Sequence, residues 1–195
     1  MLGKIHIVIF AALSLLHLAW GLNAPDAVSA ITKGLPIAFL LVMAILRVRG
    51  SHKLVIGALF FSLCGDIVSE LHLGHHLPLL LQIVFFAVAQ ICYIFEFRKY
   101  RPVSNRRKSL TNNTLSSVVP FFCCGYALLV VGNIVCASLQ KRPHKAWFVS
   151  GAVIFAISDS TILVRMIVHG FPCSGIIIMS TYYLAQFLLN RHCAE

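Results

Sequence analysis

Two carboxyl groups have unusual positions in this chain. The sequence has only six acidic residues, and Asp66 and Asp159 lie near the middle of long apolar runs. An aspartate at membrane depth costs about 2.5–3.5 kcal/mol on insertion scales, so such residues usually face the interior of a helix bundle and have a function. A purely structural hydrogen bond to a neighbouring helix is the alternative. The matched depth of the two aspartates favours a functional role.

The polar residues around the two aspartates differ. Helical spacing places Ser62, Ser69 and Glu70 on the same face as Asp66. Ser62 has the alternative of a hydrogen bond to its own helix, and Glu70 is interpreted as a solvated residue at the membrane rim. Because a neighbouring like charge favours the neutral form of a carboxyl, Asp66 is favoured as the general acid, and the similar depth of the two aspartates leaves the opposite division of roles open.

Asp159 is the predicted ionised partner, because three hydroxyl groups that can donate hydrogen bonds to its carboxylate stand beside it: Ser158, Ser160 and Thr161. Paired carboxyls of this kind divide acid and base work in glycosidases.

The last apolar run contains a stripe of polar residues at steps of four, formed by Tyr182, Gln186 and Asn190, with Tyr183 beside it. Tyrosines of membrane proteins often lie at the lipid–water interface, but a stripe that ends in Gln and Asn favours an inward face. His72, His75 and His76 have no accompanying pattern of a metal site and are interpreted as a solvated loop. No metal and no cofactor is predicted.

These residues need a membrane bundle to position them. The chain is 59% hydrophobic and 11% charged, whereas soluble proteins have about a quarter charged residues. We predict a single all-α domain over residues 1–195 with seven clear transmembrane spans: 5–22, 35–48, 54–73, 77–97, 117–139, 146–168 and 172–190. The second span is short and is expected to extend back through Pro36 in its first turn. A signal peptide over the first run is the alternative to a first membrane helix.

The net charge of +10 lies in short loops between the apolar runs. The positive-inside rule accounts for it, so no nucleic-acid partner is expected. We predict that Lys53, Arg106 and Lys141 lie on one side, the cytosol. This requires 117–139 to be re-entrant or a crossing to have been missed, because seven single crossings place Lys141 on the opposite side.

Four segments carry a family resemblance: GALFFSLCGD (57–66), QICYIFEF (90–97), GAVIFAISDS (151–160) and MSTYYLAQ (179–186). They resemble the YhhN-type membrane family, whose animal members are lysoplasmalogenases. The resemblance implies eight helices, and hydrolysis of the sn-1 vinyl ether bond of a lysophospholipid within the membrane to a fatty aldehyde and glycerophosphocholine or glycerophosphoethanolamine. It also implies that Asp66 and Asp159 are the active-site aspartates. For a eukaryotic chain it implies the endoplasmic reticulum membrane.

The resemblance and the polar stripes together give the expected substrate-binding residues: Lys33, Ser62, Gln90, Tyr93, Tyr182, Tyr183 and Gln186. Gly34 and Gln90 depart from the family, which usually has proline and often histidine there. The family also has a further helix between Phe97 and Gly151, so seven and eight helices both stay open. The rival function is a small transporter or receptor-like bundle whose aspartates relay protons or bind cations. A homo-oligomer is compatible with either function.

Overall fold

The computed structural model describes residues 4–47, 53–71, 77–99, 118–140, 145–167 and 171–190. These residues contain no strand, which confirms the all-α prediction. They form seven α-helices and one short 3-10 turn: α1 Lys4–Ala19, η1 Gly21–Asn23, α2 Asp26–Arg47, α3 Lys53–Ser69, α4 Leu77–Arg98, α5 Val118–Ser138, α6 Lys145–Ile167 and α7 Ser174–Asn190.

The surface of the bundle is suited to lipid. Large apolar side chains point outward, and Ile5, Leu46 and Leu128 are each 72% exposed. The interior instead holds polar groups such as Ser62 and Gln186, both 0% exposed. Among the described residues, three segments are long and apolar enough to cross a membrane: Ile5–Asn23, Asp26–Arg47 and Leu77–Arg98. An apolar outside around a polar inside is the pattern of an integral membrane bundle.

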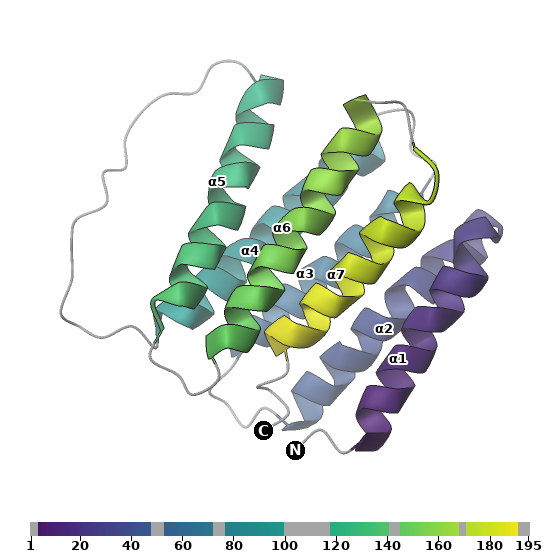
Figure 1. Cartoon of the computed structure of the whole chain (residues 1–195), viewed down its shortest axis with the longest axis horizontal. Coiled ribbons are helices and arrows are strands. Elements are labelled where there is room, and N and C mark those ends of the chain that lie inside the picture. The colour runs from purple at the N-terminus through teal and green to yellow at the C-terminus, as the bar shows by residue number, and fades with distance from the viewer. Residues whose placement is uncertain are drawn as a thin grey trace.

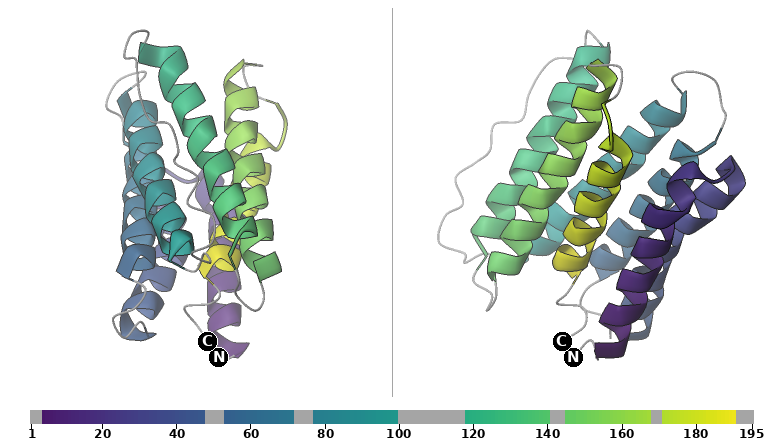
Figure 2. Two further views of the ribbon diagram at one scale, coloured as in Figure 1. Left: turned by 90° about the vertical axis from the view of Figure 1, so that its left-hand side faces the viewer. Right: turned by 45° about the vertical axis from the view of Figure 1, so that its right-hand side comes forward.

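The helices pack side by side in one bundle (Figures 1 and 2), and their contacts close into a ring. Each helix contacts the next one along the chain, and α7 contacts both α1 and α2, which closes the ring. Neighbours in a ring with an odd number of members cannot all be antiparallel. Here the exception is the pair α4 and α5, which run in the same direction (Figure 1). As a result α1 begins and α7 ends at the same end of the bundle, and Lys99 and Val118 lie at opposite ends.

The parallel course of α4 and α5 bears on the conflict between seven alternating crossings and basic loops that all lie on one side. α5 crosses the bundle once and is not re-entrant (Figure 1). The basic helix ends at Arg47, Lys53, Arg98 and Lys145 all lie at the end where α1 begins. Arg106 and Lys141 lie outside the described residues, so their common side with Lys53 stays a prediction.

The second helix differs from the prediction. It begins at Asp26 rather than near residue 35, and Pro36 lies in its interior, not in its first turn. The hydropathy of the sequence falls at Ser29, Thr32 and Lys33, which conceals the first turns of the helix. These polar side chains are buried and have partners inside the bundle. Neighbouring helices make an interior proline tolerable in a membrane helix.

Candidate functional site

The first aspartate is buried inside the bundle, three residues before the end of α3. Asp66 of α3 is 1% exposed, and the Tyr182 hydroxyl of α7 donates a hydrogen bond of 2.8 Å to its Oδ2 atom. One turn earlier on the same face, Ser62 accepts a hydrogen bond of 3.1 Å from Gln186 Nε2. Of the two roles considered for Ser62, the structure therefore shows the contact to α7. Both bonds join α3 to α7 across the ring.

The inward face predicted for the stripe on α7 is confirmed, because Tyr182, Gln186 and Asn190 are all buried. Tyr93 of α4 donates to Gln186 Oε1 at 3.0 Å, and Asn190 Nδ2 donates to the Tyr93 hydroxyl at 2.9 Å. These side chains are tightly packed against one another. Together with the bond between Ser62 and Gln186, these hydrogen bonds hold α3, α4 and α7 in register on the side of Asp66 toward the end of α7.

The second aspartate has a different donor from the expected ones. Tyr126 of α5 donates a hydrogen bond of 2.7 Å to Asp159 Oδ2. The prediction that neighbouring hydroxyls donate to Asp159 is wrong. A hydroxyl has one proton, and backbone carbonyls take it here: Ser158 donates to Ile178, Ser160 to Ala156 and Thr161 to Ile157. For Ser160 and Thr161 the acceptor is the carbonyl four residues back, the nearest acceptor on the same helix, whereas Ser158 reaches a carbonyl of α7.

Tyr126 is a residue that sequence reasoning missed. It is the lone tyrosine of an apolar run, and the signal that identifies it is its position well inside that run rather than at a membrane interface. Gln90 of α4 also interacts with the Tyr126 hydroxyl, and its Oε1 atom accepts a hydrogen bond from Asn133 of α5. Gln90 is thus in contact with the partner of Asp159.

A polar cavity of about 700 Å³ opens near the end of α3 and the beginning of α7. Its polar lining consists of His17, Ser29, Lys33, Ser69, Glu70, Gln82 and Arg165. Its apolar lining consists of Leu22, Ile162, Gly175, Ile178 and Met179. The end of α3 and the beginning of α7, which contribute to its lining, lie at the end of the bundle opposite the basic helix ends (Figure 1).

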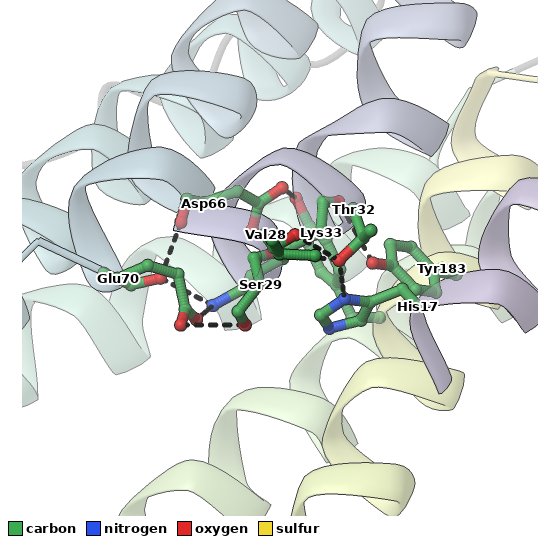
Figure 3. Close-up of polar contacts among 10 residues, drawn as sticks. His17, Val28, Ser29, Thr32, Lys33, Asp66, Glu70 and Tyr183 are labelled. Carbon is green, nitrogen blue, oxygen red and sulfur yellow. Dashed lines mark hydrogen bonds and ion pairs between the residues drawn. The ribbon is translucent and has the colours of Figure 1, made fainter. Parts of the chain in front are cut away.

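An ion pair forms one wall of this cavity (Figure 3). The Lys33 ammonium lies 2.8 Å from Glu70 Oε1 and 2.5 Å from Ser69 Oγ, and Ser29 donates to Glu70 Oε2 at 3.1 Å. Glu70 follows the last residue of α3, as expected for a residue at the membrane rim, but it is not freely solvated, because Lys33 reaches it from α2 and only 24% of its side chain is exposed. Partial burial raises the pKa of the Glu70 carboxyl, but the Lys33 ammonium, the hydrogen bond from Ser29 and the nearby His17 together outweigh this effect, so the pKa lies below its usual value.

On the side of α1, His17 contacts Thr32, the residue that precedes Lys33 in α2 (Figure 3). Thr32 donates its proton to the Val28 carbonyl at 2.8 Å, so His17 Nδ1, 3.0 Å from the Thr32 hydroxyl, must be the donor of that pair. Tyr183 donates to the Lys33 carbonyl at 3.0 Å.

All four tyrosines that the structure describes thus donate hydrogen bonds inside the bundle, which excludes the interface-belt alternative for them.

The two aspartates are connected through aromatic side chains. The ring of Tyr182, which binds Asp66, lies 5.9 Å from the ring of Phe155, one turn before Asp159 on α6. Lys33 and Glu70 are close enough to Asp66 to interact with it electrostatically. Neither aspartate is among the residues that line the 700 Å³ cavity, so the two carboxyls do not share it. From the matched depth of the two aspartates in the sequence we predict that their carboxyls lie within about 10 Å of each other, as carboxyls that act on one water do.

The described part of the chain contains no group of three His, Cys, Asp or Glu residues that could hold a metal ion. His72, His75 and His76 lie outside it.

Of the comparisons with known proteins, the one with protein-family models found a match. No curated protein and no solved structure matched the chain. The family model of the YhhN family matches residues 28–135 and 108–192. The two segments overlap over residues 108–135, which include most of α5, and together they include Lys33, Asp66 and Asp159. The chain therefore belongs to the YhhN family.

Proposed function

We propose that this protein is a lysoplasmalogenase-type hydrolase, which cleaves the sn-1 vinyl ether bond of lysoplasmalogens. The observation that carries the proposal is the environment of Asp66: a buried carboxyl in a member of the YhhN family, with Oδ2 bound by Tyr182. Its Oδ1 atom makes no hydrogen bond to any described residue. A carboxylic acid held through one oxygen has the other oxygen available to carry a transferable proton.

The chemistry needs such an acid. Hydrolysis of a vinyl ether begins with transfer of a proton to the β-carbon, which leaves an oxocarbenium ion. Water adds to this cation and loses a proton, and the resulting hemiacetal breaks down to a fatty aldehyde and the free sn-1 hydroxyl of the glycerophospholipid. Carbon is a poor proton acceptor, so the acid must be correctly placed and kept protonated. Asp66 is the proposed acid.

Asp159 is the proposed second carboxyl. In its ionised form it would stabilise the cation and orient the attacking water, as the second carboxylate does in glycosidases. The Tyr126 hydroxyl, 2.7 Å from Asp159 Oδ2, is a suitable donor for that charge. The reaction as proposed needs no metal and no organic cofactor.

In this proposal the lipid substrate enters the bundle from the bilayer. A shallow, mainly apolar groove of about 350 Å³ runs along α6 on the helix that carries Asp159, lined by Val153, Ala156, Ile157, Ser160, Thr161, Val164 and Phe171. This groove is the proposed path for the alkenyl chain, which would enter sideways from the bilayer. For a eukaryotic chain the proposed location is the endoplasmic reticulum membrane.

The test is an assay of the purified full-length protein in detergent. Aldehyde release is measured from a lysoplasmalogen and from two matched lipids, one with a saturated sn-1 ether and one with an sn-1 ester. We expect aldehyde from the vinyl ether lipid alone, and none from a double variant Asp66→Asn with Asp159→Asn. A protein that folds but releases no aldehyde would favour the transporter or receptor-like alternative.

A further inference from the structure

Arg165 is a charged residue of the cavity lining without a partner among the described residues. It lies near the end of α6, its side chain is exposed, and it lines the 700 Å³ cavity. No described residue forms an ion pair or a hydrogen bond with it. Its guanidinium group is permanently charged and can bind two oxygens of a phosphate at once.

The charges that face the cavity favour an anion of low charge. Lys33 and Glu70 neutralise each other across 2.8 Å, and Arg165 adds one positive charge. Gln82, Ser29 and Ser69 are uncharged polar groups of the same lining. A phosphodiester has one negative charge and several acceptor oxygens, which matches this set of groups.

The cavity is also placed correctly for a headgroup. Ser69 and Glu70 are on the turn that follows Asp66, and Ile162 is three residues after Asp159 on α6. In the proposed substrate the phosphodiester is a few bonds from the vinyl ether oxygen. A lipid whose phosphate lies in the cavity therefore has its reacting bond one to two helical turns deeper, at the level of the carboxyls.

We propose that this cavity binds the phosphodiester headgroup of the lysophospholipid, with Arg165 as the residue that contacts the phosphate. The proposal rests on the function proposed above, since it assigns part of the substrate of the same site. It makes Arg165 a residue of substrate binding and not of proton transfer.

The first experiment is a kinetic comparison of Arg165→Gln with wild type on two substrates, a lysoplasmalogen and a 1-alkenylglycerol that lacks the phosphodiester. Loss of a charge-assisted hydrogen bond is worth roughly a 10- to 100-fold change. We expect KM for the lysoplasmalogen to rise by that factor with little change in kcat, and the kinetics of the alkenylglycerol to be unaffected. Lys145→Gln, an exposed charge at the opposite end of the bundle, is the matched control. Equal kinetics of Arg165→Gln and wild type on the lysoplasmalogen would overturn the proposal.

A second experiment separates this proposal from the proposed reaction. Thermal unfolding is measured with added lysophosphatidylcholine, an ester lipid with the same headgroup, and separately with glycerophosphocholine and with inorganic phosphate. Ligands that bind the folded state raise its stability. We expect stabilisation by the lipid in wild type and in Lys145→Gln, and its loss in Arg165→Gln. This result without any aldehyde release would support the headgroup site and refute the reaction. Stabilisation by inorganic phosphate but not by the lipid would overturn the proposal, because the site would then take free phosphate.

Discussion

The bundle contains two three-helix units with the same course through the membrane. In α2–α4 and again in α5–α7 the middle helix runs opposite to its two neighbours, and α3 and α6 point the same way (Figure 1). Each middle helix has a Gly-Ala sequence followed by an aspartate, in GALFFSLCGD and GAVIFAISD. Parallel repeats of this kind are known in membrane transporters. Two such units placed in sequence account for the parallel pair α4 and α5.

The two units nevertheless surround their aspartates differently. Asp66 is fully buried, near an ion pair, and takes its hydrogen bond from the other unit, from Tyr182 on α7. Asp159 is half-buried, beside an apolar groove, and takes its hydrogen bond from Tyr126 within its own unit. Equivalent positions in the two units are therefore expected to do different work. The predictions below test that difference.

The largest effects are expected for the aspartates themselves. Asp66→Asn and Asp159→Asn keep the size of the side chain but remove the acid or the charge. General acid–base help is worth about a hundredfold to ten-thousandfold in rate, so kcat for aldehyde release should fall by that amount in each. Circular dichroism would check that both variants fold. Near-wild-type turnover in both would remove these residues from the reaction.

The tyrosines distinguish a neutral carboxyl from an ionised one. A hydrogen bond to a charged group is worth about 1.5–3 kcal/mol and one between neutral groups about 1 kcal/mol. If Asp159 is the ionised partner, Tyr126→Phe should lower kcat roughly 10- to 100-fold and Tyr182→Phe only about 5-fold. The reverse order would exchange the roles of the two aspartates.

The ion pair at the cavity should give a pH-dependent stability. The lowered pKa of Glu70 means that its contribution is present above the ordinary pKa of a glutamate and is lost as the pH falls through the lowered value. Because the pair is partly exposed, we expect Glu70→Gln to cost about 1–2 kcal/mol at neutral pH. Thermal unfolding across pH 3–7 measures this. The gap to wild type should narrow in acid, and a gap that stays constant with pH contradicts the assignment.

The smallest effect is expected at the hydroxyls beside Asp159. Ser160 and Thr161 donate to backbone carbonyls of their own helix. Ser160→Ala and Thr161→Val should therefore change kcat by less than about twofold, since a helix keeps its backbone bonds without them. A large loss in either variant would mean that the hydroxyl turns to Asp159 during the reaction.

The sequence predicted the inward aspartates and the stripe on α7 because both follow from general costs. A charge is expensive in lipid, and polar residues at steps of four must share one face of a helix. The partners were harder to predict. The hydroxyl that binds Asp159 belongs to a tyrosine 33 residues away on another helix, with no polar neighbours in sequence to mark it.

The direction of α5 and the position of Arg165 at the cavity were not predicted, for related reasons. Hydropathy finds a span but not the direction in which the chain crosses, so the parallel pair α4 and α5 was not evident. An arginine near the end of a span resembles an ordinary flanking cation. Only the ring of helices places Arg165 on the same cavity as Lys33 and Glu70.

The distribution of basic helix ends indicates which end of the bundle faces the cytosol. Arg47, Lys53, Arg98 and Lys145 lie at the end opposite the cavity, and the positive-inside rule assigns that end to the cytosol. On this assignment the proposed headgroup cavity would open to the lumen or the exterior. Under the proposed reaction the water-soluble glycerophosphodiester would be discharged away from the cytosol, whereas the fatty aldehyde would stay in the bilayer, from which it can reach enzymes on either face.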